Sequence, residues 1–132
     1  MLFCVYLDGL LHLFQKSNLG CFIDDVFVGA MAYANDIALL APTAQAMRYM
    51  LQVCDQYAKE YSMVFNASKS KCLVISRRKH SLVTNVKPTF YIGGKEIEYV
   101  DSWPHLDNLV HTSCNDQHDI VSKKNSLCGQ IN

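Results

Sequence analysis

The stretch from Val26 to Ala41, VFVGAMAYANDIALLA, constrains the fold of this chain more than any other segment. Two apolar runs flank a single polar pair, Asn35-Asp36. The run before the pair mixes β-branched and aromatic residues with alanines, and the run after it is wholly apolar up to Pro42. Two such runs around an Asn/Asp pair predict a β-hairpin. The sequence therefore predicts an exposed carboxylate, Asp36, at the end of a buried two-stranded ribbon.

Length and composition predict one domain with a hydrophobic core, because the chain has 132 residues and half of them are apolar. Twelve basic residues balance twelve acidic ones. A dedicated nucleic-acid-binding domain is usually clearly basic, so this balance gives no support for that class.

Cysteine usage and the N-terminal stretch bear on the compartment. The six cysteines include no CxxC pair, which favours reduced thiols in an intracellular protein of the nucleus or cytoplasm. The apolar N-terminal stretch has no basic segment before it, and Asp8 and His12 interrupt it. Neither a signal peptide nor a membrane span is expected.

Helical periodicity marks two segments around the ribbon. Apolar residues recur at helical spacing from Leu2 to Phe14 and from Thr43 to Tyr61, where Thr43 is a candidate N-cap. The methionines and tyrosines of the second segment form an apolar stripe that is expected in the core. Between the first helix and the ribbon, Gly20 to Val28 predicts a short strand and a turn at Asp24-Asp25.

The C-terminal half predicts short strands separated by loops. Phe65 to Ile75 is a polar loop followed by a strand, Thr89 to Val100 is a hairpin with its turn at Gly93-Gly94, and Ser102 to Leu106 is another strand. Residues 76–88 form a linker that opens with four basic residues, for which an exposed loop is a better explanation than a phosphate contact.

The tetrapeptide Tyr33-Ala34-Asn35-Asp36 resembles the Tyr-Ala-Asp-Asp box of reverse transcriptases. Two further blocks, FNASKSKCLV and GGKEIEYVDSWPHL, follow in the order found in the RNA-directed DNA polymerases of non-LTR retrotransposons. The resemblance runs from about Leu2 to Asn132. It implies an α+β fold: a partial polymerase palm, with an antiparallel sheet, a catalytic-type β-hairpin and packed helices. Residues 1–75 would hold the hairpin, both helices and an outer strand, and residues 89–132 a primer-grip-like hairpin and the start of the thumb.

The resemblance also implies a chemistry. Template-directed nucleotidyl transfer uses two Mg²⁺ ions that converging carboxylates hold. Asn35 stands at the first acidic position of the box and Asp36, the metal ligand implied for this chain, at the second. A neutral amide can bind a cation but cannot offset its charge, so tight Mg²⁺ binding is expected only in an intact parent enzyme. A turn pair without further role explains Asn35-Asp36 equally well.

Further roles follow from the same resemblance. Tyr33 and Ala34 would flank the primer end, and Lys69 or Lys71 would protonate the departing pyrophosphate as a general acid. Their positions do not distinguish the two lysines, and a solvated loop that starts a strand is an equal alternative. Residues of the primer-grip region would be Trp103, His105 and Leu106. Asp107 replaces the glycine that follows them in the family.

A zinc site in the C-terminal tail is the weaker of two explanations for its histidines and cysteines. Their spacing matches no familiar ligand pattern, and scattered His and Cys residues in a polar tail are usually incidental. The residues concerned are His111, Cys114, His118 and Cys128.

The sequence therefore implies a fragment of a reverse transcriptase. Its partners would be an RNA template, a DNA primer and the remaining fingers, palm and thumb segments of the parent polyprotein, with no membrane. Because the upstream aspartate, fingers and thumb are expected elsewhere and the box reads YAND, we expect no activity from the isolated chain. The alternative is a non-catalytic nucleic-acid or protein-binding module derived from a retroelement, and a third hypothesis is a chain that folds poorly.

Overall fold

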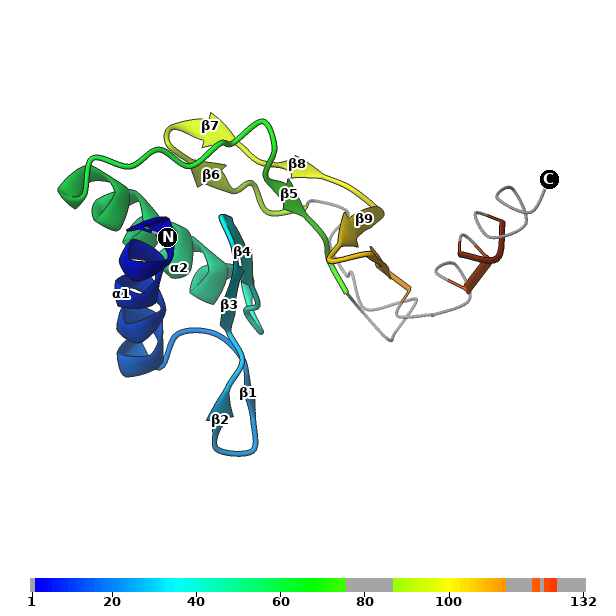
Figure 1. The fold of residues 1–132 in the computed structure, drawn as a ribbon, viewed down its shortest axis with the longest axis horizontal. Coiled ribbons are helices and arrows are strands. Elements are labelled where there is room, and N and C mark those ends of the chain that lie inside the picture. Colours follow the sequence, from blue (N-terminus) through cyan, green and yellow to red (C-terminus); the bar gives the residue numbers. More distant parts are fainter. Residues whose placement is uncertain (1, 76–86, 114–119, 122, 126–132) are drawn as a thin grey trace. The chain divides into compact units, whose positions relative to one another are not determined.

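The computed structural model describes residues 2–75, 87–113, 120–121 and 123–125 (Figure 1). The chain divides into two units, which are described separately: unit 1 is Met1–Ala67 with Pro88–Glu96, and unit 2 is Ser68–Lys87 with Ile97–Asn132. The elements of unit 1 are α1 (Leu2–Ser17), β1 (Phe22–Ile23), β2 (Val26–Phe27), β3 (Ala30–Tyr33), β4 (Asp36–Leu39), α2 (Ala44–Glu60), β6 (Tyr91–Ile92) and β7 (Lys95–Glu96). Those of unit 2 are β5 (Lys71–Cys72), β8 (Glu98–Tyr99), β9 (Ser102–His105) and β10 (Asn108–His111).

Both helices lie where the periodicity predicts them. Helix α1 continues past Phe14 to Ser17, whose hydroxyl donates to the Phe14 carbonyl at 2.9 Å. Helix α2 begins after Thr43, whose side-chain oxygen accepts from the Ala46 N–H at 3.1 Å, so the predicted N-cap is confirmed. The core of unit 1 consists mainly of side chains from these two helices: Leu7, Leu10, Phe14, Met50, Leu51, Cys54, Tyr57 and Ala58.

Gly9 is the point at which α1 and α2 approach each other closely. A Cβ atom on Gly9 would lie 2.5 Å from the hydroxyl oxygen of Tyr57, and this hydroxyl donates to the Tyr6 carbonyl at 2.5 Å. The Tyr61 ring lies 4.3 Å from the Tyr57 ring and 5.8 Å from the Tyr6 ring, measured between centroids. Burial raises the pKa of the Tyr57 phenol, and the neighbouring Tyr61 raises it further. A larger side chain at Gly9 would therefore displace the Tyr57 hydroxyl from its hydrogen bond with Tyr6.

The segment from Val26 to Tyr33 is shared between two hairpins (Figure 1). β2 pairs with β1 across the predicted Asp24-Asp25 turn, whereas β3 pairs with β4. The apolar run before the polar pair is thus divided, because the chain bends at Gly29. There, a Cβ atom would lie 2.8 Å from the Cα atom of Gly20, so the two backbones approach too closely for any side chain.

Cys21 connects these two hairpins through its backbone. Its N–H donates to the Leu40 carbonyl at 3.0 Å, and its own carbonyl accepts from the Val28 N–H at 2.9 Å. The Leu40 N–H donates in turn to the Gly29 carbonyl at 2.7 Å. These three hydrogen bonds fix the base of β1–β2 against the base of β3–β4.

The hairpin predicted around Gly93-Gly94 is confirmed as β6–β7. Both glycines have positive φ angles, 58° and 74°, which suits the tight turn. Asp55 of α2 accepts a hydrogen bond from the Gly93 N–H at 2.8 Å, and the Arg48 guanidinium lies 5.8 Å from the centroid of the Phe90 ring. Helix α2 therefore holds this hairpin in unit 1.

Unit 2 contains two strand pairs. β5 pairs in parallel with β8, and only Lys71 and Cys72 of the predicted strand up to Ile75 take part. β9 forms an antiparallel hairpin with β10, a strand that the sequence did not predict. Its turn residues, Leu106 and Asp107, have left-handed φ angles of 49° and 62°. Most of the predicted linker at 76–88 lies outside the described residues.

No helix in the described part of the chain has the length and apolar character needed to cross a bilayer.

The burial of Cys54 generates a prediction about thiol reactivity. Burial raises the pKa of this thiol to about 12, and nearby Asp55 contributes in the same direction. The thiolate is the reactive form, and a pKa of about 12 instead of 9.0 lowers the thiolate fraction of Cys54 at pH 8 from about one in ten to about one in ten thousand. We expect iodoacetamide to label Cys54 at least tenfold more slowly than half-buried Cys21, as measured by peptide mass spectrometry. Urea should abolish the difference, and equal labelling without urea would contradict the fold of unit 1.

Candidate functional site

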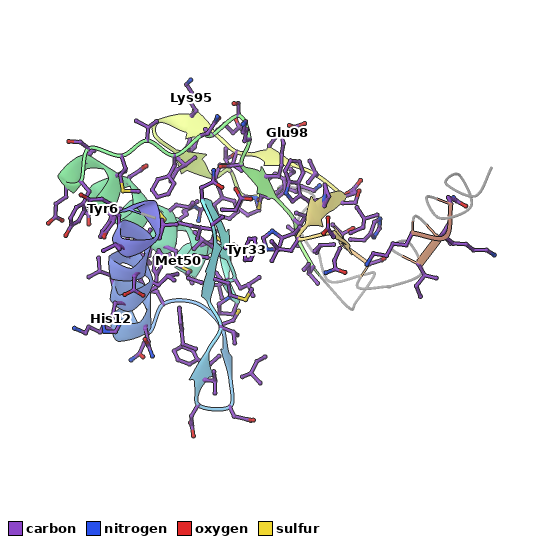
Figure 2. All side chains as sticks on the ribbon, viewed as in Figure 1. Tyr6, His12, Tyr33, Met50, Lys95 and Glu98 are labelled. Carbon is purple, nitrogen blue, oxygen red and sulfur yellow. The ribbon has the colours of Figure 1, made fainter. Side chains whose placement is uncertain are left out.

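The YAND tetrapeptide forms the closed end of the β3–β4 hairpin. Tyr33 and Asp36 face each other as the last cross-strand pair, and Ala34-Asn35 form the two-residue turn between them. Asp36 is thus the first residue of β4 and not part of the turn itself. All four residues are exposed, and Figure 2 shows Tyr33 on β3. The predicted exposed carboxylate at the hairpin end is confirmed.

The ribbon behind this end is not buried, so that prediction is wrong. Met31 and Tyr33 lie on one face of β3, because side chains two residues apart in a strand share a face. Their exposed fractions are 48% and 64%. Helix α1 packs against β3, but the described residues leave this face of the strand open. The apolar runs predicted a buried ribbon, whereas no residue of β3 or β4 is fully buried among the described residues.

The charge at the hairpin end is that of one carboxylate. Asp36 has Asn35, a neutral amide, as its sequence neighbour and Tyr33 as its cross-strand neighbour. Among the described residues, no group of three or more His, Cys, Asp or Glu side chains is placed to hold a metal ion. Mg²⁺ prefers several anionic oxygens in near-octahedral geometry. Asp36 and the Asn35 side-chain oxygen can supply one charged and one neutral ligand atom.

Ala34 occupies a backbone conformation that does not suit its side chain. Its φ angle is 52°, in the left-handed region that favours glycine. Alanine at this turn position therefore has a small energetic cost. The Tyr-Ala-Asp-Asp box that the tetrapeptide resembles also has alanine at this position.

Because of this strain, we expect substitution by glycine to change the free energy of unfolding in opposite directions at Ala34 and at Ala32. Ala34→Gly should raise the free energy of unfolding by about 1 kcal/mol, because glycine adopts a left-handed φ without strain. Ala32→Gly, the control in strand β3, should lower it by about 0.5–1 kcal/mol, because glycine weakens a strand. Urea unfolding measures both values. Destabilisation by Ala34→Gly would contradict the turn geometry.

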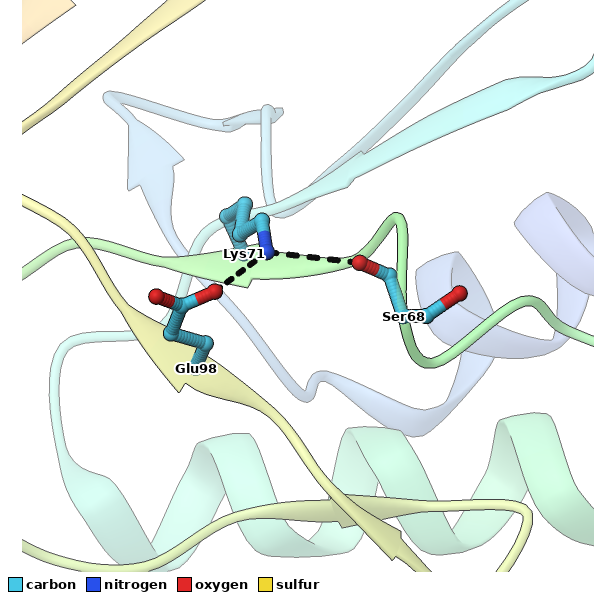
Figure 3. A network of polar contacts seen from close by, with 3 residues as sticks. All are labelled: Ser68, Lys71 and Glu98. Atoms are coloured by element: carbon cyan, nitrogen blue, oxygen red, sulfur yellow. Dashed lines mark hydrogen bonds and ion pairs between the residues drawn. The ribbon is translucent and has the colours of Figure 1, made fainter.

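The structure separates the two candidate lysines that the sequence left equal. The Lys71 ammonium donates to Glu98 Oε2 at 2.5 Å and to the Ser68 carbonyl at 3.3 Å (Figure 3). It also lies 6.0 Å from the centroid of the Trp103 ring. Its side chain is only 16% exposed, whereas Lys69 is an exposed residue. Lys71 is therefore held within unit 2 by three groups, and proton donation would require these contacts to open.

The primer-grip residues of the sequence analysis lie on the β9–β10 hairpin of unit 2. Trp103 pairs with Val110 and His105 pairs with Asn108, so these four side chains share one face. Leu106 is in the turn and is exposed. The structure thus brings Trp103 together with Lys71, and Tyr33 together with Asp36.

Sequence reasoning missed Glu98 and the environment of Cys72. Glu98 comes opposite Lys71 only through the parallel pairing of β5 with β8, and no local sequence pattern indicates such a pair. Burial raises the pKa of the Cys72 thiol, although a hydrogen bond with Tyr99 and the charge of Lys87 act in the opposite direction. The Lys87 ammonium lies 5.2 Å from the Tyr99 ring centroid.

Of the residues considered for zinc, only His111 lies within the described part of the chain. Its Nδ1 atom accepts from the Ser113 N–H at 3.0 Å and lies 2.7 Å from the Ser113 hydroxyl. Cys114, His118 and Cys128 lie outside the described residues.

The Lys71 contacts predict a measurable coupling. In a double-mutant cycle with Lys71→Met and Glu98→Gln, we expect a coupling free energy of about 0.5–1 kcal/mol, because the Glu98 end of the pair is solvated. Lys71→Met should also shift the fluorescence of Trp103, the one tryptophan of the chain. The matched variant Lys69→Met should show no coupling with Glu98→Gln and should leave the fluorescence of Trp103 unchanged. Equal effects of the two lysine variants would contradict the network.

Comparison with known proteins gives one informative similarity. The chain is 37% identical over 68 residues to the "Retrovirus-related Pol polyprotein from type-1 retrotransposable element R2" of Popillia japonica. The matched segment is 50% of this chain and 14% of that polyprotein, so half of the chain is related to a small part of a retrotransposon polyprotein. No family model matches the sequence, and no solved structure matches it.

Proposed function

We propose that this chain derives from the palm of a non-LTR retrotransposon reverse transcriptase, and that its β3–β4 hairpin is an altered catalytic hairpin. The observation that carries the proposal is the placement of the Tyr33-Ala34-Asn35-Asp36 box at the exposed end of a two-stranded antiparallel hairpin. A carboxylate at such a position can approach a bound nucleic acid and its metal ions. The similarity to a retrotransposon Pol polyprotein supports the same origin.

The proposed chemistry is template-directed nucleotidyl transfer with two Mg²⁺ ions, in a parent enzyme with an RNA template and a DNA primer. Asp36 would be a metal ligand there, and Tyr33 and Ala34 would lie beside the primer end. Lys69 and Lys71 are the candidates for the general acid, and Lys71 would have to leave Glu98 and the Ser68 carbonyl to act. Trp103, His105 and Leu106 would contact the primer from the β9–β10 hairpin.

The same proposal includes the loss of that activity. Each Mg²⁺ brings two positive charges, and catalysis requires anionic ligands that hold both ions beside the reacting phosphates. Asn35 replaces a negative charge by a dipole without changing the size of the side chain much. The hairpin therefore keeps its fold and loses part of its affinity for metal. We expect no nucleotide incorporation by the 132-residue polypeptide.

A chimera provides the test. The chain replaces the corresponding segment of an active retrotransposon reverse transcriptase, either unchanged or with Asn35→Asp. We expect the Asn35→Asp chimera to extend a primer at least about 100-fold faster than the unchanged chimera, because metal-ion charge stabilisation is worth several kcal/mol. Primer extension on an RNA template with Mg²⁺ measures the rates.

The control adds Asp36→Asn to the Asn35→Asp chimera. It leaves one carboxylate, as in the unchanged chain, but at position 35 instead of 36. Lower activity in this control supports a metal-binding role for both positions. Equal activity of the unchanged and the Asn35→Asp chimeras would refute the charge argument. Primer extension by the unaided 132-residue chain would refute the proposed inactivity.

A further inference from the structure

The β1–β2 hairpin, residues 22–27, is called the acidic arm below. Its end carries an exposed apolar cross-strand pair: Ile23 is 65% exposed and Val26 is 64% exposed. The rings of Phe22 and Phe27 meet edge to face behind this pair, with centroids 5.2 Å apart. A single two-stranded hairpin is marginally stable in water, so two β-branched side chains left in solvent at its end provide little stability. They form a surface suited to contact with another molecule.

The base of the acidic arm is held in place. The hydrogen bonds of Cys21 and the close approach of Gly20 to Gly29 connect it to the β3–β4 hairpin. A Cβ atom on Gly29 would also lie 2.6 Å from the Phe27 ring, so the ring packs directly on that backbone. Within unit 1 the arm extends away from α1 and from β3–β4 (Figure 1). It therefore presents its end at a fixed position on the unit.

The charge of the acidic arm defines the chemistry of its partner. Asp24 and Asp25 form the turn, and both are exposed. Between Lys16 and Arg48 the sequence contains three aspartates and no lysine, arginine or histidine. Such a surface repels the phosphates of nucleic acids and attracts cationic groups. The fitting partner is a protein surface that combines exposed apolar side chains with lysine or arginine.

Unit 2 of the same chain has this composition. Unit 1 contains seven acidic and four basic residues, whereas unit 2 contains five acidic and eight basic residues. Unit 2 also exposes the large apolar side chains of Trp103, Leu106 and Val110 on or beside its β9–β10 hairpin. The two units therefore carry opposite net charges, and each exposes apolar side chains.

We propose that the acidic arm of one copy of this chain docks on unit 2 of a second copy. Ile23 and Val26 would cover exposed apolar side chains of that unit, and Asp24-Asp25 would face the lysines of its described part. Such a contact joins two different surfaces, so it is heterologous and can continue beyond a dimer. The inference depends on the exposure and charge of the arm and not on the catalytic origin of the neighbouring hairpin.

Sedimentation velocity of the 132-residue chain over a wide concentration range tests the proposal. We expect association that grows with concentration and weakens at high salt, because salt screens exposed charges. Asp24→Asn/Asp25→Asn should weaken it by roughly fivefold, since exposed charge pairs contribute modestly. Asparagine was chosen because, like aspartate, it tolerates the left-handed φ angle of 51° that residue 24 adopts. The control Glu60→Gln/Glu96→Gln removes the same charge from exposed sites of unit 1 off the arm, and should have a smaller effect.

A second pair of variants tests the apolar contact. Ile23→Thr/Val26→Thr keeps β-branched residues in the strands and should weaken association by roughly tenfold, because it removes apolar contact area. The control Val5→Thr/Val64→Thr alters two valines of unit 1 that are at least as exposed, at 71% and 93%, and should leave association unchanged. Slow labelling of Cys54 in every variant verifies that unit 1 is folded.

Three outcomes would overturn the proposal. The chain stays monomeric at all concentrations, which excludes a second copy as the partner. Association increases with salt, which indicates apolar aggregation without the charged contact. The control pairs weaken association as much as the arm variants do, which places the contact elsewhere on unit 1.

Discussion

Unit 1 depends on the close approach of α1 and α2 at Gly9. The Tyr57 hydroxyl of α2 occupies the space that a side chain at Gly9 would fill, and it donates a hydrogen bond to the carbonyl of Tyr6, which like Gly9 belongs to α1. Leu10 and Phe14 of α1 and Met50 of α2 are fully buried in the same core. Helix α1 then packs against β3, and α2 packs against β6. The position of the candidate catalytic hairpin thus follows from a helix contact rather than from a large sheet, because each sheet among the described residues has only two strands.

Local patterns were sufficient to predict the helices, the Thr43 cap and the Gly93-Gly94 turn, because each depends on residues that are close in sequence. Three features could not be found in this way. The bend at Gly29 depends on Gly20 approaching from an earlier segment, the Lys71–Glu98 pair depends on parallel pairing across 27 residues, and the exposure of β3 depends on what covers it. An apolar run predicts a strand, but it does not tell whether this chain buries both of its faces.

The candidate site shows why sequence and structure carry different information at residue 35. Asparagine and aspartate serve about equally well in a tight turn, so the hairpin forms with either residue at position 35. Metal binding distinguishes them, because only aspartate contributes a negative charge to the ligand set. The fold of the hairpin therefore gives no indication of activity. The identity of one side chain, which the printed sequence already contains, separates an intact nucleotidyl-transfer site from an altered one.

The formal net charge of zero also conceals a difference between the two units. As an average it argued against nucleic-acid binding by the whole chain, and that argument holds for unit 1, where acidic residues exceed basic ones. It does not hold for unit 2, which has an excess of basic residues and an exposed tryptophan beside a lysine. A polymerase palm needs both characters, because carboxylates hold the metal ions while basic and aromatic groups hold the nucleic acid. The opposite net charges of the two units are also the observation on which the proposed association between copies rests.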